Sequence, residues 1–311
     1  MLKEFGAIMK KTILLLTLPI FLFANFFEFK PLEITKDISC FIGDYNPVLK
    51  SNRGFVSNVC YIDMGNFLVL LDTSATYNFA KELNAFIEKS TNKKIKFVIV
   101  TNYHDDRLLG ASYFKEKGVK IAGASSLPKL IKSHPDTYRR TMTALPKDLT
   151  KNTKAVTPDL LIDKELEIKG SNKRIYVIKP SKGTQSAADL IVYSPKDSFI
   201  FTGNTIFNGR FVNYASDSNM NEWIKALKLI KNKNAKYVMG GHGKRFDANS
   251  YKPTLEYLLM LRKQVKKAYE EDIDPADLEK YVHTDKFKDI PHYKELYLRN
   301  ARHYFDQLEW Q

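Results

Sequence analysis

A short polar segment that follows an apolar run carries the residues best suited to chemistry. Residues 101–110 come directly after the apolar run 94–100 and contain His104, Asp105 and Asp106. A strand that ends in closely spaced His and Asp residues directs several side chains at one point, as a site for a metal-activated water requires. Taken alone, the same segment also fits a polar turn or the start of a helix. The rest of the chain must decide between these readings.

Four further polar segments each lie next to an apolar run, in an order that supports a shared site. They are Leu71-Asp72-Thr73-Ser74, residues 183–189, Phe201-Thr202-Gly203-Asn204 and Gly240-Gly241-His242-Gly243. Each of these segments flanks a predicted strand.

Strands alternate with helices in two successive rounds, which predicts an α/β fold. The patterns predict strands at 37–43, 55–64, 67–73, 94–100, 119–124, 160–169, 174–178, 189–193, 198–202 and 235–239. They predict helices at 76–90, 106–117 and 223–231, and C-terminal helices beginning near Pro253, Pro275 and Pro291. We expect two sheets packed face to face with helices outside.

These ordered segments resemble the metallo-β-lactamase superfamily. In outline, with residues 298–302, the chain is most similar to periplasmic hydrolases found beside sulfur-oxidation and quinoprotein systems. The resemblance implies an αββα sandwich over residues 25–250, followed by a C-terminal helical extension over residues 251–311. It covers nearly all of the chain after the N-terminal segment.

The resemblance also implies metal ligands, several of which are substituted here. The family loop reads His-x-His-x-Asp-His, whereas Asn102 and Arg107 occupy its first and last positions in this chain; a single-zinc subclass shows the same two replacements. One implied metal position consists of Asp106, Asn204 and His242, and the other consists of Asn102, His104 and Gln185. Four of these seven positions are therefore substituted, since only His104, Asp106 and His242 remain.

The substitutions weaken metal binding, because zinc prefers imidazole, thiolate or carboxylate ligands to neutral amides. Arg107 adds a positive charge that repels a second dication unless its side chain turns outward. We therefore expect the protein to bind at most one Zn or Mn ion, weakly, or no metal at all. One ion on Asp106 and His242, helped by Asn204 or His104, would supply a water nucleophile, with His104 or Asp106 as its base.

Two functions remain open. The substitutions favour a non-catalytic or metal-poor descendant that binds a small anionic ligand or a partner through Arg107, His104 and Gln185. The alternative is a single-metal hydrolase of an ester, thioester or lactam bond. In both, Asp72 and Asp189 are expected to brace loops by hydrogen bonding rather than to bind metal.

The N-terminus predicts export. Lys10 and Lys11 precede an apolar run at 12–23 that ends at Ala24, a pattern typical of a cleavable signal peptide over residues 1–24. The run is too short for a permanent membrane span, although an uncleaved anchor stays an alternative. Met9 fits the start of such a signal better than Met1. We therefore expect a periplasmic protein with no stable membrane span after cleavage.

Composition favours a small-molecule partner over nucleic acid. The net charge is +14, but Lys residues are spread along the chain with acidic residues between them, as on a solvated surface. Cys40 and Cys60 lie on neighbouring predicted strands, which leaves either a cross-strand disulfide or two buried thiols. The sequence leaves the oligomeric state open.

Three further expectations concern the surroundings of the site. The C-terminal helices are expected to cover a sheet edge rather than to bind a partner. Residues 133–157 are expected to form a loop that arches over the site as a lid. The remaining histidines are expected to lie on the surface or in packed positions: His134, His283, His292 and His303.

Overall fold

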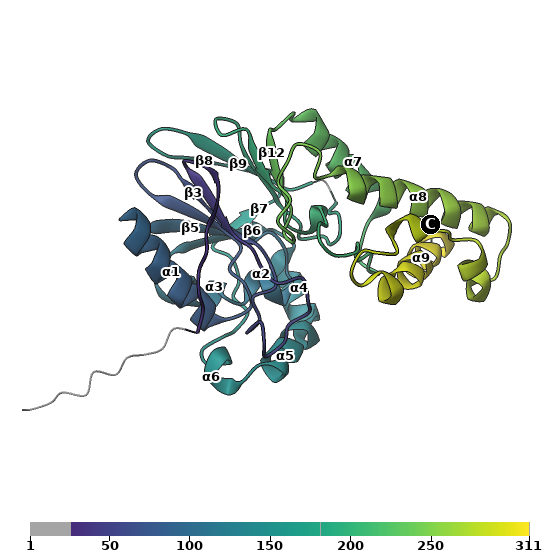
Figure 1. Cartoon of the computed structure of the whole chain (residues 1–311), viewed down its shortest axis with the longest axis horizontal. Helices are drawn as coiled ribbons and strands as arrows, with labels where there is room; N and C mark the ends of the chain where they lie inside the picture. Colours follow the sequence, from purple (N-terminus) through teal and green to yellow (C-terminus); the bar gives the residue numbers. More distant parts are fainter. Residues whose placement is uncertain (1–25, 181, 311) are drawn as a thin grey trace, which may run out of the picture.

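Two sheets packed face to face form the centre of the computed structural model, which describes residues 26–180 and 182–310 (Figure 1). Within these residues the first sheet has the strand order β1-β2-β3-β4-β5-β6-β7 and the second has the order β12-β11-β10-β9-β8. The strands of the first sheet are β1 (Leu32–Thr35), β2 (Ile38–Phe41), β3 (Val59–Asp63), β4 (Leu68–Leu71), β5 (Ile95–Ile99), β6 (Lys120–Ala124) and β7 (Leu160–Ile162). Those of the second are β8 (Glu165–Lys169), β9 (Arg174–Ile178), β10 (Ile191–Ser194), β11 (Phe199–Phe201) and β12 (Tyr237–Met239).

Helices lie outside both sheets, which confirms the predicted αββα arrangement (Figure 1). Those of the first half are α1 (Tyr77–Thr91), α2 (Asp105–Leu108), α3 (Ala111–Glu116), α4 (Leu127–Ser133), α5 (Pro135–Ala144) and α6 (Lys147–Thr150). Those of the second half are η1 (Gly203–Thr205), α7 (Met220–Asn232), α8 (Lys252–Glu270), η2 (Pro275–Lys280), η3 (Asp285–Phe287) and α9 (Tyr293–Glu309). None of these described helices is long and apolar enough to cross a membrane.

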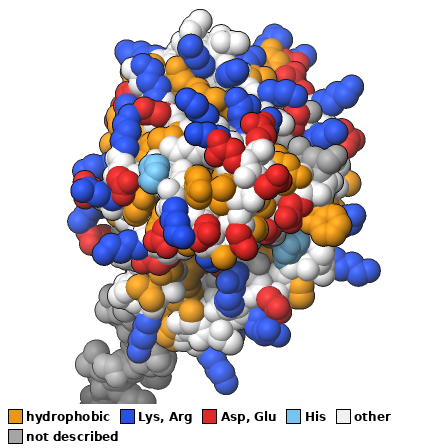
Figure 2. Space-filling view, turned by 90° about the vertical axis from the view of Figure 1, so that its right-hand side faces the viewer, with side chains coloured by type: hydrophobic (Ala, Val, Ile, Leu, Met, Phe, Trp, Pro, Cys, Tyr) orange, Lys and Arg blue, Asp and Glu red, His pale blue; other side chains and the backbone are white. Residues whose placement is uncertain are grey.

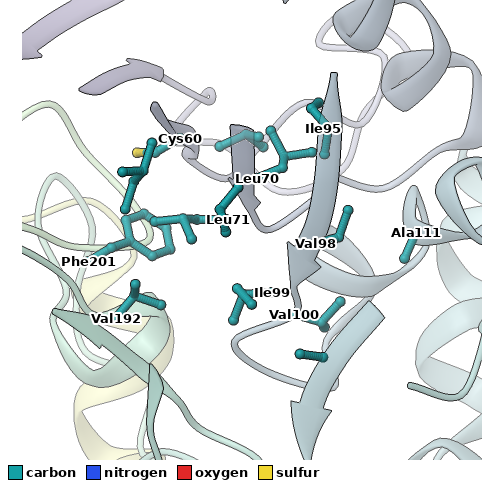
Figure 3. Close-up of a cluster of buried hydrophobic side chains, with 14 of the residues drawn as sticks. Cys60, Leu70, Leu71, Ile95, Val98, Ile99, Val100, Ala111, Val192 and Phe201 are labelled. Atoms are coloured by element: carbon teal, nitrogen blue, oxygen red, sulfur yellow. The ribbon is translucent and has the colours of Figure 1, made fainter. Parts of the chain in front are cut away.

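Alternating side chains of the second sheet supply two hydrophobic cores. Val192 and Phe201 face the first sheet and pack in the core that contains Leu71 (Figure 3). Ile191 and Ile200, their neighbours in the strands, belong to the other core with α7, α8 and α9. Successive side chains of a strand point to opposite faces, so β10, β11 and β12 serve both cores, whereas the core residues of β8 and β9 belong to the first. The C-terminal helices join this second core through α7, because α8 packs against α7 and α9 packs against α8, away from the sheets (Figure 1).

Two predicted elements are interrupted in the structure. The strand predicted at 160–169 is wrong as one element, because β7 pairs with β6 in the first sheet while β8 pairs with β9 in the second. The helix predicted at 106–117 is divided into α2 and α3 around Leu109 and Gly110. At Gly110 a Cβ atom would lie 2.1 Å from the carbonyl oxygen of Thr73, so the backbones approach too closely for any side chain.

The two cysteines form a disulfide. Cys40 on β2 and Cys60 on β3 are direct cross-strand partners, and the bond joins the two strands within the first sheet. The sequence left open a disulfide or two buried thiols, and the structure rules out the thiols. The bond joins β2 to β3, and the loop between these strands carries Gly43 and Asn58, whose side-chain oxygen accepts from the Gly43 N–H.

Two regions bear on the remaining expectations. The predicted signal peptide, with Met9, Lys10, Lys11 and Ala24, lies outside the described residues. On the face of the molecule that Figure 2 presents, basic side chains are scattered with acidic side chains between them. This distribution matches a solvated surface, and the expected absence of a nucleic-acid partner stays a prediction.

Candidate functional site

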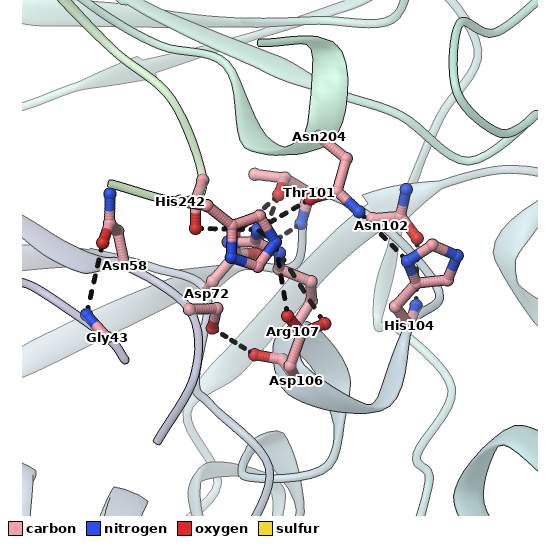
Figure 4. A network of polar contacts seen from close by, with 12 residues as sticks. Gly43, Asn58, Asp72, Thr101, Asn102, His104, Asp106, Arg107, Asn204 and His242 are labelled. Atoms are coloured by element: carbon pink, nitrogen blue, oxygen red, sulfur yellow. Dashed lines mark hydrogen bonds and ion pairs between the residues drawn. The ribbon is translucent and has the colours of Figure 1, made fainter. Parts of the chain in front are cut away.

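The polar segments singled out in the sequence meet at one end of the paired sheets. Asp72 follows β4, residues 101–107 follow β5, Asn204 lies in η1 after β11, and His242 follows β12. Parallel pairing of β4 with β5 and of β11 with β12 places the ends of these strands at the same edge. Figure 4 shows the labelled side chains converging there from both sheets.

Asp72 braces the loop that carries the other polar residues. Its carboxylate accepts hydrogen bonds from the backbone N–H of Thr101 at 2.8 Å and from the Thr101 hydroxyl at 2.7 Å. Asp72 itself has a φ of 61°, in the left-handed region that few residues other than glycine adopt. Burial raises the pKa of Asp72 to about 6, which leaves the carboxylate ionised at neutral pH.

Arg107 points inward and fills the centre of the site. Its side chain is fully buried, with Nη1 3.1 Å from the Asp72 carboxylate. Nη2 donates to the Asn204 side-chain oxygen at 2.7 Å and to the Gly241 carbonyl at 2.8 Å. The same nitrogen lies 2.9 Å from Nε2 of His242. The sequence allowed Arg107 to turn outward, and the structure shows the opposite orientation.

The contacts of His242 define its tautomer. A guanidinium nitrogen can only donate, so Nε2 of His242 must accept from Arg107. Nδ1 lies 2.9 Å from the Val56 carbonyl and therefore carries the proton. Burial, together with the charges of Arg210 and Arg107, lowers the pKa of His242 well below its ordinary value. The imidazole is thus neutral, and its lone pair points at an arginine.

Asn204 joins Arg107 to His104. Its side-chain oxygen accepts from Arg107, and its side-chain nitrogen lies 3.0 Å from Nδ1 of His104. Nδ1 of His104 is therefore an acceptor, which places the proton of the neutral ring on Nε2. Burial lowers the pKa of His104 to about 4. Both polar atoms of the Asn204 amide are engaged within the protein.

A second amide network replaces the other implied metal position. The side-chain nitrogen of Asn102 donates to the Gln185 oxygen at 3.2 Å, to the Ser186 hydroxyl at 3.1 Å and to the Asp189 carboxylate. Its oxygen accepts from the backbone N–H of His104 at 2.9 Å. Within the described chain, the buried side-chain nitrogen of Gln185 has no hydrogen-bond partner. Asn102 thus holds two loops together through its amide.

The residues present do not fit a zinc ion in this arrangement. The lone pairs of Asn204 and His242 that would face a metal accept hydrogen bonds from Arg107 instead. Asp106, the remaining anionic candidate, lies 3.6 Å from Nε2 of His242 and 3.9 Å from Nε of Arg107. Across residues 26–180 and 182–310, no group of three or more His, Cys, Asp or Glu residues is arranged to hold a metal. A cation would have to displace the guanidinium.

Sequence reasoning missed several residues that build the site. Asn58 donates to the carbonyls of Gly240 and Gly243 at 2.9 Å and 2.6 Å, which fixes the loop that carries His242. A Cβ atom at Gly241 would lie 2.2 Å from Nη2 of Arg107, so the glycine makes room for the guanidinium. Burial lowers the pKa of Arg210 to about 10, and the nearby charge of Asp106 opposes that shift. Apart from the Gly-Gly dipeptide, nothing in the sequence marked these positions.

Residues 133–157 do not form the predicted loop. They include α5 and α6, and α5 packs beside the segment that contains His104. The Tyr138 hydroxyl donates to the Tyr103 carbonyl at 2.9 Å, and the Thr141 hydroxyl donates to Asp105. His134 packs against Tyr103 with the rings tilted by 45° and their centroids 4.9 Å apart, rather than reaching the site. A helical element thus supports the segment from the side.

This fold and this edge of the sheets define the class of the protein. The chain belongs to the metallo-β-lactamase superfamily, whose family model matches residues 52–242. Members of the superfamily generally bind zinc. The closer affinity to the sulfur-oxidation type, which the sequence suggested, stays a prediction.

The chain is similar to several metallo-β-lactamases of type 2. It is 27% identical to one from Bacillus sp. (strain 170) over 206 residues, which cover 65% of this chain and 72% of that protein. It is 26% identical to one from Bacillus cereus over 212 residues, which cover 67% and 75%. Among solved structures, a metallo-β-lactamase from Pontibacter korlensis has a TM-score of 0.60 at 19% identity, covering 75% of this chain and 99% of that one. At that identity the structural likeness supports the fold alone.

Proposed function

We propose that this protein is an exported, metal-independent member of the superfamily whose former metal site is a structural network, and that it binds a small anionic ligand or a partner. The observation that carries the proposal is the position of Arg107. Its guanidinium is hydrogen-bonded to Asn204 and His242 and paired with Asp72. Two implied metal ligands are therefore engaged by a fixed internal cation.

The energetics of the buried charges support this role for Arg107. Asp72 and Arg107 are both fully buried, so each charge depends on the other and on its hydrogen bonds. A metal ion would need the guanidinium to leave, which would strand the Asp72 carboxylate and return a buried cation to water. Amides at positions 102, 185 and 204 offer too little charge to offset that cost. A metal-free state is consistent with each of these contacts.

The alternative is a hydrolase with one Zn or Mn ion on Asp106 and His242, acting on an ester, thioester or lactam bond. Asp106 and His242 do lie close together, at 3.6 Å between Oδ2 and Nε2. This alternative predicts that Arg107 swings away when metal is supplied. The two functions therefore predict different positions of the Arg107 guanidinium when metal is supplied: inside the site for the metal-independent protein and outside it for the hydrolase.

Metal analysis of the exported chain separates the two functions. The protein is purified from the periplasm without a metal-binding tag, its N-terminus is determined by mass spectrometry, and its zinc and manganese contents are measured before and after incubation with each ion. The matched control is the Asp106→Ala/His242→Ala variant. We expect a chain that begins at Asn25 and holds well under one metal ion per molecule. About one ion per chain, lost in the control, would establish the hydrolase instead.

A further inference from the structure

A cavity of about 230 Å³ lies where the C-terminal extension meets the loop that follows η1. The loop contributes Arg210, Phe211 and Asn213, and α9 with its N-cap contributes His292, Glu295, Leu296 and Arg299; Pro47 completes the wall. The cavity is smaller than the ~300 Å³ that drug-sized ligands require, so its ligand must be small. None of the five sequence segments that predicted the site lines it.

The charged groups of the cavity favour an anion. Arg210 and Arg299 carry fixed positive charges, and Glu295 is the single acidic side chain in the wall. Among the described residues, none forms a hydrogen bond or ion pair with the Arg210 guanidinium, which lies instead over the Phe207 ring at 5.7 Å. An arginine at the edge of a cavity whose guanidinium makes no hydrogen bond or ion pair with the described protein is suited to bind a carboxylate.

The cavity is held open by contacts at its rim. The Arg299 guanidinium donates to the Asn213 side-chain oxygen at 2.5 Å, which aligns α9 with the loop. Nε2 of His292 lies 3.3 Å from the Tyr45 carbonyl, and His292 adopts a φ of 70° at the start of α9. The two basic groups from α9 are therefore positioned by residues of the main domain.

Apolar and basic groups divide the wall between them. Phe211, Leu296 and Pro47 offer apolar surface, whereas Arg210 and Arg299 offer donors. Such a pocket suits a small carboxylate with an apolar or aromatic body better than a fully hydrated inorganic ion. The Phe207 ring under the Arg210 guanidinium lies 6.0 Å from the His242 ring, centroid to centroid, so the cavity borders the region of the former metal site.

We infer that this cavity is the site for the small anionic ligand, and that the ligand is an organic carboxylate held by Arg210 and Arg299. The inference rests on the ligand-binding role in the proposed function, and it assigns that role to the junction with the C-terminal extension. The buried pair Arg107 and Asp72 does not take part. The extension thereby supplies half of the residues that line the binding site.

Binding of benzoate to the exported full-length chain tests the inference. Isothermal titration in zinc-free buffer compares the wild type with Arg210→Gln and Arg299→Gln. The control is Arg302→Gln, an exposed position on the same helix that does not line the cavity. Loss of one charge-assisted hydrogen bond should weaken benzoate binding about tenfold or more in each cavity variant. The Arg302 variant should bind as the wild type does, and Arg299→Lys should recover part of the affinity.

Several outcomes would contradict the assignment of this cavity as a carboxylate site. They are the absence of saturable benzoate binding, equal binding by wild type and both cavity variants, and stronger binding of inorganic phosphate than of benzoate. Circular dichroism of each variant establishes that it is folded. If Arg299→Gln does not fold, Arg299→Lys, which keeps the positive charge, is compared with the wild type instead. Zinc content is measured on the same samples. Stoichiometric zinc with intact benzoate binding would refute the metal-independent function and leave the cavity in place.

Discussion

Nη2 of Arg107 lies 2.9 Å from Nε2 of His242, on the lone pair that the imidazole would offer to a metal. The other ring nitrogen of His242 is bonded to the Val56 carbonyl, so the ring cannot turn to present a second lone pair without losing that bond. The identity of the residue at position 107 therefore controls what His242 can bind.

Arg107 is expected to be essential for stability. Replacing it in the Arg107→Met variant leaves the Asp72 carboxylate buried without its cation, which should lower the free energy of unfolding by about 3–5 kcal/mol. Urea unfolding followed by circular dichroism measures the change. Arg245→Met is the control, because the Arg245–Asp247 pair is exposed and should contribute less than about 1 kcal/mol. Equal stability of both variants would show that the buried pair has no such role.

Restoring a metal ligand should depend on removing the guanidinium. A thiolate in the Asn204→Cys variant would complete a set with Asp106 and His242, but Arg107 would still occupy the lone pair of His242. The Asn204→Cys/Arg107→Ser variant should bind zinc at least about tenfold more tightly than Asn204→Cys alone. Competition with a chromogenic chelator measures both affinities. The idea fails if the two variants bind zinc equally well.

The pKa of His104 predicts a dependence of stability on pH. Burial lowers that pKa to about 4, so between about pH 6.5 and pH 4 the unfolded chain binds a proton that the folded chain does not. Stability from this group is present above pH 6.5 and is lost as the pH falls. Between pH 7.5 and pH 5, the free energy of unfolding of the wild type should fall by about 1–2 kcal/mol more than that of the His104→Gln variant. Parallel pH profiles of unfolding for the two proteins would contradict this assignment.

The disulfide should stabilise the mature protein. It closes a loop with a sequence separation of 20 residues between β2 and β3. The Cys40→Ser/Cys60→Ser variant should therefore lose about 2–4 kcal/mol of unfolding free energy. Thermal unfolding of the variant, with reduced and oxidised wild type beside it, provides the measurement. Indistinguishable melting of oxidised and reduced wild type would mean that the bond adds nothing.

Much of the fold could be predicted from local patterns. The apolar runs located β5, β9 and β12 within two residues, and η2 begins at Pro275 as predicted, capped by Asp274, which accepts from the Ala276 N–H at 2.8 Å. Hydrophobic periodicity and capping residues act over a few positions, so they are visible in the chain. The division of residues 160–169 between two sheets was not visible, because it depends on pairing with β6 and β9.

The sequence by itself determined which strand-end segments reach the site edge, because a side chain that directly follows a strand lies at the end of the sheet, and the family resemblance identified which implied ligands are substituted. Only the tertiary structure decided that Arg107 turns inward, because its four partners come from three other segments. They lie 35, 97, 134 and 135 positions away, at Asp72, Asn204, Gly241 and His242. The cavity at α9 was likewise decided by packing between distant segments. A side chain's direction is set by the charges and space around it, which only the folded chain supplies.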